Sequence, residues 1–185
     1  MHSLVLLAKK AVEIFIQEGK IISVPEDFPE EFSEKKMGAF VTIEKKGNLR
    51  GCIGTYLPTQ ENIAKEIIQN AIAAATEDYR FGPIQKEELS YLSYKVYILK
   101  EPELVKNVNE LDPKKYGIIV KTVTLSEAGD VISNGHFVPK SGLLLPGLKG
   151  IDTIENQILI ACQKGGINPI KEKILIYKFT VEKYQ

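Results

Sequence analysis

Residues 37–44 alternate and are rich in Phe, Val, Thr and Ile, as is typical of a strand. The turn residues Lys45-Lys46-Gly47-Asn48 follow, and residues 49–56 are interpreted as the return strand. Two such segments joined by a short turn form an antiparallel hairpin. A doubly wound parallel sheet instead joins its strands through crossover helices. The hairpin therefore excludes a simple βαβ rhythm in this part of the chain and favours an α+β fold.

The rest of the chain mixes helices and strands. Apolar residues at three- and four-residue spacing predict helices from Leu4 to about Gly19, over residues 63–75, and from a capping box at Asp152 to about Lys164. Residues 93–99, 116–124 and 174–181 are typical of strands, and Asn134-Gly135 is a strong turn signal. Residues 23–35, with two prolines, predict a surface connection. We therefore expect an antiparallel or mixed sheet with flanking helices.

The charge balance argues against one class of partner. The chain has 185 residues with 24 Lys and Arg against 24 Asp and Glu, so its formal net charge is zero. A nucleic-acid-binding domain usually carries an excess of basic residues, so a nucleic-acid partner is disfavoured, although a local basic patch stays open.

The cellular compartment is predicted from the membrane, targeting and disulfide features of the sequence. No apolar run reaches the roughly 18 residues of a membrane span, and no basic segment precedes the first apolar residues. Cys52 and Cys162 are far apart and form no CxxC pair. We therefore expect a reduced cytoplasmic protein, with no membrane association. Its many Ile, Lys and Glu residues hint at a thermophilic source.

The densest group of chemically interesting residues lies in the second strand of the hairpin. An uninterrupted strand over residues 49–56 would place Arg50, Cys52, Gly54 and Tyr56 on one face. A guanidinium beside Cys52 would favour its thiolate form and make it a candidate nucleophile. The alternative is that Cys52 is a small buried packing residue, which is common for cysteine, and that the glycines around it only permit close packing.

Asp78 and Arg80 follow the second predicted helix and could contribute to the same site. Two charged residues two positions apart could bind a polar ligand, or orient Cys52 if their loop folds over it. They could equally form an ordinary ion pair or cap the helix. The residue types and spacing leave these alternatives open.

Other chemistries have weaker support. His2 lies at the N-terminus and His136 follows the predicted turn, and a Cys52–His136 pair would require contact in the fold. The two cysteines and two histidines lack the spacing of a zinc site, so we predict no metal site. Residues 142–150 are glycine-rich without a nucleotide-binding motif and are best interpreted as a bend between strands. No cofactor is indicated.

The segment Leu49-Arg50-Gly51-Cys52-Ile53-Gly54 resembles the signature of the AMMECR-one domain family, which is also called protein A of the AmmeMemoRadiSam system. The similarity extends in order over most of the chain. It includes Asn70-Ala71, Ala73-Ala74-Ala75, Asp78-Tyr79-Arg80-Phe81-Gly82-Pro83, Glu88-Leu89, Glu101-Pro102-Glu103, Gly142-Leu143-Leu144-Leu145-Pro146 and Cys162-Gln163-Lys164-Gly165-Gly166. Tyr79 departs from the family, which has proline at this position.

The resemblance implies a single domain over residues 1–185, built from two intertwined lobes, the larger and the smaller, with the signature facing a cleft between them. It implies no particular reaction. It associates the family with a Memo-like protein and a radical S-adenosylmethionine enzyme as partners in a modification pathway.

These observations lead to one main hypothesis and two alternatives. The main one is a component of that pathway that binds a small-molecule ligand or substrate through Arg50, Gly51, Cys52, Gly54, Asp78 and Arg80. The first alternative is a non-enzymatic module that docks a partner protein through the apolar residues 143–148. The second is an enzyme that uses Cys52 as its catalytic nucleophile.

Overall fold

The computed structural model describes residues 1–123 and 139–185. The chain divides into two compact units, which are described separately here. Unit 1 comprises Met1–Lys100 and Glu182–Gln185, and unit 2 comprises Glu101–Val181. The chain thus leaves unit 1, builds the whole of unit 2, and returns to unit 1 for its last residues. The predicted Asn134-Gly135 turn and His136 lie outside the described residues.

Unit 1 contains a four-stranded sheet with the strand order β2-β1-β3-β8. Strand β1 (Ala39–Lys45) pairs antiparallel with both β2 (Asn48–Thr55) and β3 (Leu92–Leu99). Strand β8 (Val181–Tyr184) completes the sheet beside β3. The predicted hairpin is confirmed, and it leaves β2 as one edge of the sheet.

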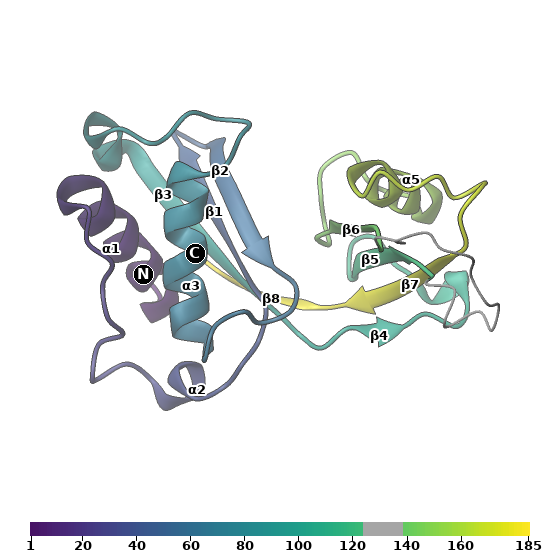
Figure 1. Ribbon diagram of the computed structural model, residues 1–185, viewed down its shortest axis with the longest axis horizontal. Coiled ribbons are helices and arrows are strands. Elements are labelled where there is room, and N and C mark those ends of the chain that lie inside the picture. The colour runs from purple at the N-terminus through teal and green to yellow at the C-terminus, as the bar shows by residue number, and fades with distance from the viewer. Residues whose placement is uncertain (124–138) are drawn as a thin grey trace, which may run out of the picture. The chain divides into compact units, whose positions relative to one another are not determined.

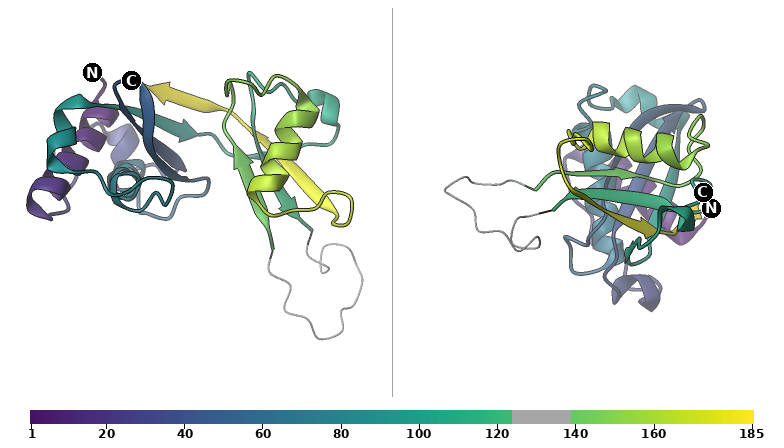
Figure 2. Two further views of the ribbon diagram at one scale, coloured as in Figure 1. Left: turned by 90° about the horizontal axis from the view of Figure 1, so that it is seen from above. Right: turned by 90° about the vertical axis from the view of Figure 1, so that its right-hand side faces the viewer.

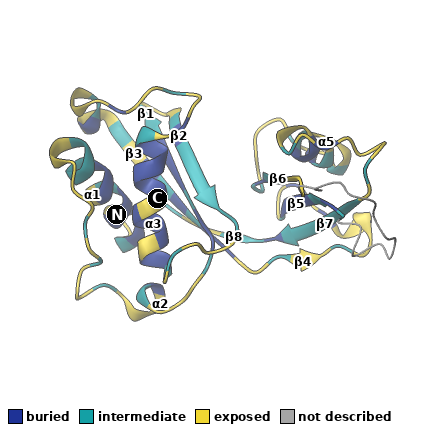
Figure 3. Cartoon of the chain, viewed as in Figure 1, coloured by how far each residue is buried: buried dark blue, intermediate teal, exposed yellow. Residues whose placement is uncertain are grey.

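Helices α1 (Ser3–Glu18) and α3 (Ile63–Thr76) pack on the same face of this sheet (Figures 1 and 2). Alternate residues of each strand point into the core, for example Val41 and Ile43 of β1 and Val96 of β3. They meet the buried apolar stripes of both helices, and Figure 3 shows that α3 is buried along most of its length. Small side chains, including Ala71, Ala74 and Ala75, let α3 approach the sheet closely.

Unit 2 contains a second antiparallel sheet, with the order β4-β7-β5-β6. Its strands are β4 (Glu103–Leu104), β5 (Gly117–Thr122), β6 (Ser141–Leu144) and β7 (Ile174–Phe179). Helix α5 (Ile154–Lys164) packs against β5 and β6. A small core results, in which Ile118, Val120 and Leu144 of the sheet meet Ala161 and Cys162 of the helix. Helices and antiparallel sheets in both units confirm the predicted α+β class.

Several predicted boundaries need correction. Helix α5 takes Thr153 as its N-cap, whose side chain accepts a hydrogen bond from the Asn156 N–H, so the capping box predicted at Asp152 is wrong. The single strand predicted over 174–181 is divided in the structure. Residues 174–179 form β7 in the sheet of unit 2, and β8, which begins at Val181, belongs to the sheet of unit 1. Residues 141–144 form β6, where a bend had been predicted.

Three short helices also escaped prediction. They are α2 (Glu30–Ser33), inside the predicted surface connection, and the 3₁₀ helices η1 (Lys86–Tyr91) and η2 (Val108–Glu110). Elements of three to six residues are too short for helical periodicity to be recognised in the sequence. Within the described ranges, none of the helices has both the length and the apolar character required to span a membrane.

Candidate functional site

Cys52 lies in the middle of the edge strand β2. Its partner across the ladder is Thr42 of β1, and the Cys52 Sγ and Thr42 Oγ1 atoms are 3.2 Å apart on the face of the sheet opposite α3. The side chain of Cys52 is partly exposed, and neither cysteine of the chain is in a disulfide. The thiol therefore belongs to the sheet face that α1 and α3 leave uncovered.

The loop after α3 holds the backbone of Cys52. The Cys52 N–H donates to Asp78 Oδ2 at 2.8 Å, and the Cys52 carbonyl accepts from Arg80 Nη2 at 3.3 Å. Arg80 also binds Asp78 through Nε and Nη2, at 2.9 and 2.6 Å. Both backbone groups that an edge strand would expose at Cys52 are thus bonded to one carboxylate–guanidinium pair.

This pair is also electrostatically stabilised. Hydrogen bonds from Arg80 and from the Cys52 N–H lower the pKa of Asp78 to about 2, although burial of the carboxylate opposes ionisation. The side chain of Arg80 is 45% exposed, whereas that of Asp78 is almost fully buried. Asp78 therefore acts as a fixed anion that orients Arg80, and Arg80 presents part of its guanidinium to solvent beside Cys52.

Arg50 has a different environment from the one predicted. The β1–β2 register shifts at a bulge, where Ile43 pairs with Gly51 and Glu44 pairs with Leu49, so Arg50 has no partner in β1. The expectation that strand alternation places Arg50 on the face of Cys52 is therefore wrong, because a bulge breaks the alternation. The guanidinium next to Cys52 is that of Arg80.

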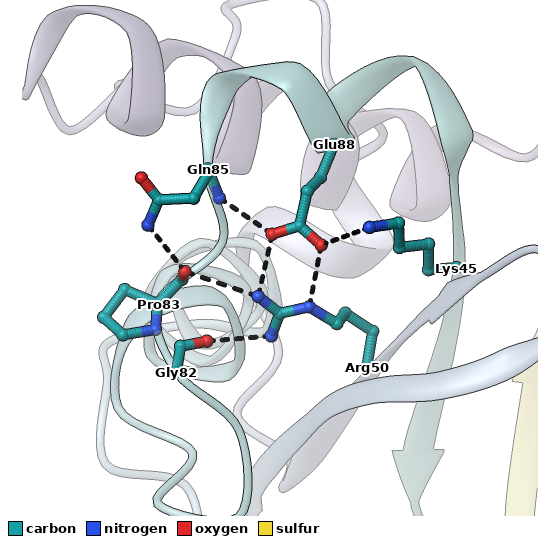
Figure 4. A network of polar contacts seen from close by, with 6 residues as sticks. All are labelled: Lys45, Arg50, Gly82, Pro83, Gln85 and Glu88. Atoms are coloured by element: carbon teal, nitrogen blue, oxygen red, sulfur yellow. Dashed lines mark hydrogen bonds and ion pairs between the residues drawn. The ribbon is translucent and has the colours of Figure 1, made fainter.

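The guanidinium of Arg50 is held in a polar network drawn in Figure 4. Its Nε and Nη2 atoms bind the two carboxylate oxygens of Glu88 at 3.0 and 2.9 Å. Its Nη1 and Nη2 atoms also donate to the carbonyl oxygens of Gly82 and Pro83 at 2.8 and 3.3 Å. The side chain of Arg50 is only 16% exposed, and its guanidinium makes four hydrogen bonds. Arg50 is therefore a structural clamp between β2 and residues 82–88.

Glu88 is the centre of this network. Besides Arg50, it accepts hydrogen bonds from Lys45 Nζ at 2.9 Å and from the Gln85 N–H at 3.0 Å. The Arg50 hydrogen bond is the largest cause that lowers the pKa of Glu88 to about 2, against the opposing effect of burial. The carboxylate is therefore ionised over the whole range in which the protein would normally be studied.

The two glycines of the signature have separate steric roles. A Cβ atom on Gly51 would lie 2.1 Å from the carbonyl oxygen of Ala74, so α3 can approach β2 only where this side chain is absent. A Cβ on Gly54 would lie 2.2 Å from the ring of Phe40, its cross-strand neighbour. Gly51 thus admits the helix on one face, and Gly54 admits an aromatic ring on the other.

A buried carboxylate fixes the chain just after the signature. Glu66 of α3 has no exposed surface and accepts hydrogen bonds from Thr55 Oγ1 at 2.5 Å and from the N–H groups of Thr59 and Gln60, both at 2.7 Å. Burial opposes its ionisation, but these hydrogen bonds outweigh burial and lower its pKa. Residues 55–60 are therefore anchored to α3 by neutral donors alone.

The face that carries Cys52 also carries Tyr97 of β3, two strands away. Tyr97 pairs with Phe40 in the register of β1 and β3, and burial raises its pKa, with smaller effects from Cys52 and Glu44. Thiol, hydroxyl and phenol groups from Cys52, Thr42 and Tyr97 thus share one face of the sheet. The Arg80 guanidinium reaches the adjacent edge.

The remaining predicted positions are distributed as follows. Cys162 is fully buried in unit 2, and burial raises the pKa of its thiol. Leu144 is part of the unit 2 core, whereas Leu148 is exposed. Within residues 1–123 and 139–185, no group of three or more His, Cys, Asp or Glu side chains is arranged to hold a metal ion.

Prediction from the residues missed Glu88, Thr42 and Glu66 as members of the site. Glu88 is 38 positions from Arg50, and no local spacing signals that pairing. The only trace in the sequence was the family-like dipeptide Glu88-Leu89. Thr42 could have been found by aligning the predicted hairpin across its turn.

The model of the AMMECR1 family matches residues 5–184. The chain therefore belongs to this family, the AMMECR-one domain family that its signature resembles. Among solved structures, an uncharacterised protein of Pyrococcus horikoshii superimposes with a TM-score of 0.81 at 33% identity, covering 97% of this chain and 88% of that one.

Relatives match over almost the whole chain. A protein of Thermotoga maritima is 46% identical over 185 residues, covering all of this chain and 98% of the relative. A Clostridium acetobutylicum protein is 41% identical over 182 residues, covering 98% of this chain but only 35% of the relative. In that second protein the matching region is thus about a third of a much longer polypeptide.

Proposed function

We propose that this protein is a binding component of a modification pathway, and that it receives a small ligand or substrate on the Cys52 face of unit 1. The observation that carries this proposal is the Asp78–Arg80 pair. It holds both backbone groups of Cys52 and leaves part of a guanidinium exposed beside a partly exposed thiol. An ordered cation next to polar groups on a sheet face is suited to bind a small anionic group.

The six residues predicted for this site divide into two roles in the proposal. Arg80 and Cys52 contact the ligand, with Gly54 beside them on the strand edge. The other three residues position these groups. The polar atoms of Asp78 and Arg50 are bonded within the protein, and the absent side chain of Gly51 makes room for helix α3. Arg80 thereby supplies the guanidinium beside Cys52 that was first expected of Arg50.

A Memo-like protein and a radical S-adenosylmethionine enzyme are the proposed partners. The association that the family resemblance implies supports this. Binding of the two candidate partners, expressed from the same genome, is measured by sedimentation with the purified protein. Absence of a complex with either protein, with and without S-adenosylmethionine, would argue against this part of the proposal.

Ligand binding is tested by two linked measurements. Phosphate, small carboxylates, nucleotides and S-adenosylmethionine are screened for a rise in melting temperature and for protection of Cys52 from alkylation. We expect at least one compound to do both, and Arg80→Gln to remove both effects. Lys9→Gln is the matched control, since Lys9 pairs with Glu13 on helix α1, which packs on the opposite face of the sheet. A screen without any compound that protects Cys52 would contradict the proposal.

A second candidate is an enzyme with Cys52 as its nucleophile. It is favoured by the electrostatic interaction between Arg80 and Cys52, since a neighbouring cation stabilises a thiolate. Cys52→Ser and Cys52→Ala separate the two functions. Both variants should still bind ligand if the protein only binds, whereas a covalent adduct on Cys52, seen by mass spectrometry and absent from both variants, would favour the enzyme.

A further inference from the structure

A cavity of about 250 Å³ lies in unit 1, between the segment after α1 and helix α3. Residues 21–24 form one wall, and Lys65, Ile68 and Gln69 of α3 form the other, with Gln60 at the end. Neither Cys52 nor its partners Asp78 and Arg80 line it. The cavity is therefore a separate feature that the proposed function leaves unexplained.

The wall formed by residues 21–24 has the properties of a strand that lacks a partner. Gly19, with a φ of 70°, ends α1, and the chain then runs to α2 without entering a helix or strand (Figure 1). Ile22 and Val24 pack against the core, whereas Ile21 and Ser23 are exposed. This alternation, together with the restriction that Pro25 places on Val24, indicates an extended backbone.

The backbone of this segment is not hydrogen-bonded to the described residues. No N–H or carbonyl group of residues 21–24 has a hydrogen-bond partner among the described residues. The neighbouring turn, by contrast, is closed by a hydrogen bond from the Phe28 N–H to the carbonyl oxygen of Pro25. An extended segment with open N–H and carbonyl groups is a template for another extended chain. The complementary occupant is therefore a peptide backbone.

The opposite wall specifies side chains for that occupant. Lys65, Ile68 and Gln69 lie at the i, i+3 and i+4 positions of α3 and so share one face of the helix. The apolar part of the lining comes from Ile21, Ile22, Val24 and Ile68, and the polar part from Ser23, Gln60, Lys65 and Gln69. The volume is below the roughly 300–1,000 Å³ of most small-molecule pockets, so it suits one side chain of a longer occupant.

The charge of the lining indicates one further property of the occupant. Among the residues that the structure describes, Lys65 is the only charged one that lines the cavity, and it pairs with Glu61, one turn earlier on the surface. Both side chains are substantially exposed, and exposed pairs of this kind contribute little free energy. A carboxylate on the occupant could therefore replace Glu61 at small cost.

We propose that the groove between residues 21–24 and helix α3 binds an extended peptide segment of a partner protein. The peptide adds as a strand to residues 21–24, inserts one aliphatic side chain into the cavity, and places an acidic side chain at Lys65. This mode takes its affinity from main-chain hydrogen bonds and its specificity from the side-chain pocket. It is independent of ligand binding at Cys52.

The test starts from a library of short random peptides displayed on phage and selected on the intact protein. We expect enrichment of sequences that contain an aliphatic residue close to Asp or Glu. Affinities of the selected peptides are then measured by fluorescence anisotropy. Ser23→Pro, which removes one N–H, and Lys65→Glu should each weaken binding at least about tenfold. Ser23→Ala, which keeps that N–H, and Lys10→Glu, on the exposed side of α1, should leave it within about twofold.

A measurement on the unaltered protein keeps the test valid even if the proline variant does not fold. Bound peptide should slow hydrogen exchange at least about tenfold for alternate amides of residues 21–24, because alternate N–H groups of an extended segment point to the same edge. No enrichment, unchanged exchange in this segment, or affinities insensitive to both Ser23→Pro and Lys65→Glu would overturn the proposal. Self-association in sedimentation that Ser23→Pro abolishes would also overturn it, because the occupant would then be a second copy of the chain.

Discussion

The guanidinium of Arg50 binds both carboxylate oxygens of Glu88, and the same group closes onto the carbonyl oxygens of Gly82 and Pro83. The arginine of the signature therefore forms its hydrogen bonds with other groups of the protein. We expect Arg50→Gln to lower the free energy of unfolding by about 2–4 kcal/mol, because the mostly buried carboxylate of Glu88 loses its bidentate partner and keeps only Lys45 as a cation. Urea denaturation followed by circular dichroism measures this.

Two further variants show whether geometry matters as well as charge. Arg50→Lys keeps the charge but cannot form the forked pair, so its stability should fall between those of Arg50→Gln and the unaltered protein. Lys20→Gln removes an exposed pair with Glu18 and should cost less than about 0.5 kcal/mol. If Arg50→Gln were no more harmful than Lys20→Gln, the clamp would have no role in stability.

Acid should destabilise the protein over a defined range of pH. The pKa values of Asp78 and Glu88 are both lowered to about 2, from ordinary values of 3.8 and 4.5. A carboxylate with a lowered pKa in the folded state contributes stability above its unfolded pKa and loses it as pH falls through its folded pKa. The free energy of unfolding should therefore decline as pH falls from about 4.5 to about 2.

The assignment of this decline to particular groups is checked with Asp78→Asn and Glu88→Gln. Each variant should be less stable than the unaltered protein at pH 7 and should show a shallower decline in acid. Thermal unfolding at closely spaced pH values measures both effects. Curves that remained parallel to that of the unaltered protein would assign the acid sensitivity to other carboxylates.

Gly51 should not tolerate a methyl group. In Gly51→Ala the new Cβ would lie 2.1 Å from the carbonyl oxygen of Ala74, so strand and helix must separate. We expect a loss of about 2 kcal/mol or more in the free energy of unfolding. Gly82→Ala is the control, since nothing lies within 4 Å of its added Cβ, and its effect should stay within about 0.5 kcal/mol. Equal stability of the two variants would refute the close contact.

The two cysteines should differ in reactivity. Cys52 is partly exposed and should be alkylated by iodoacetamide in the folded protein, whereas Cys162 is fully buried with a raised thiol pKa and should react only after unfolding. Arg80→Gln should slow alkylation of Cys52 at least about threefold at neutral pH, because the neighbouring guanidinium favours the thiolate. Mass spectrometry of timed samples separates the two sites.

Rapid alkylation of Cys162 in the folded state would show that the unit 2 core opens readily. A rate at Cys52 that depends on Arg50 but not on Arg80 would return the thiol-activating role to the residue that strand alternation first suggested. The comparison therefore distinguishes the two arginines directly.

The elements that could be predicted from the sequence are those whose information is local. The hairpin at 37–56 and helices α1, α3 and α5 follow from side-chain periodicity and turn residues, because one face of each element must be buried. The loop position of Asp78 and Arg80 followed from where α3 ends. Membership of the AMMECR1 family rests on a signature and an order of motifs that are also readable along the chain.

Only the tertiary structure decided how the signature residues are used. A single bulge in β2 removed Arg50 from the face of Cys52, and its partner Glu88 lies 38 positions away, on η1. The cation beside Cys52 instead comes from Arg80, 28 positions away. Long-range pairings of this kind depend on how strands and loops are brought together in space, so no spacing along the chain encodes them.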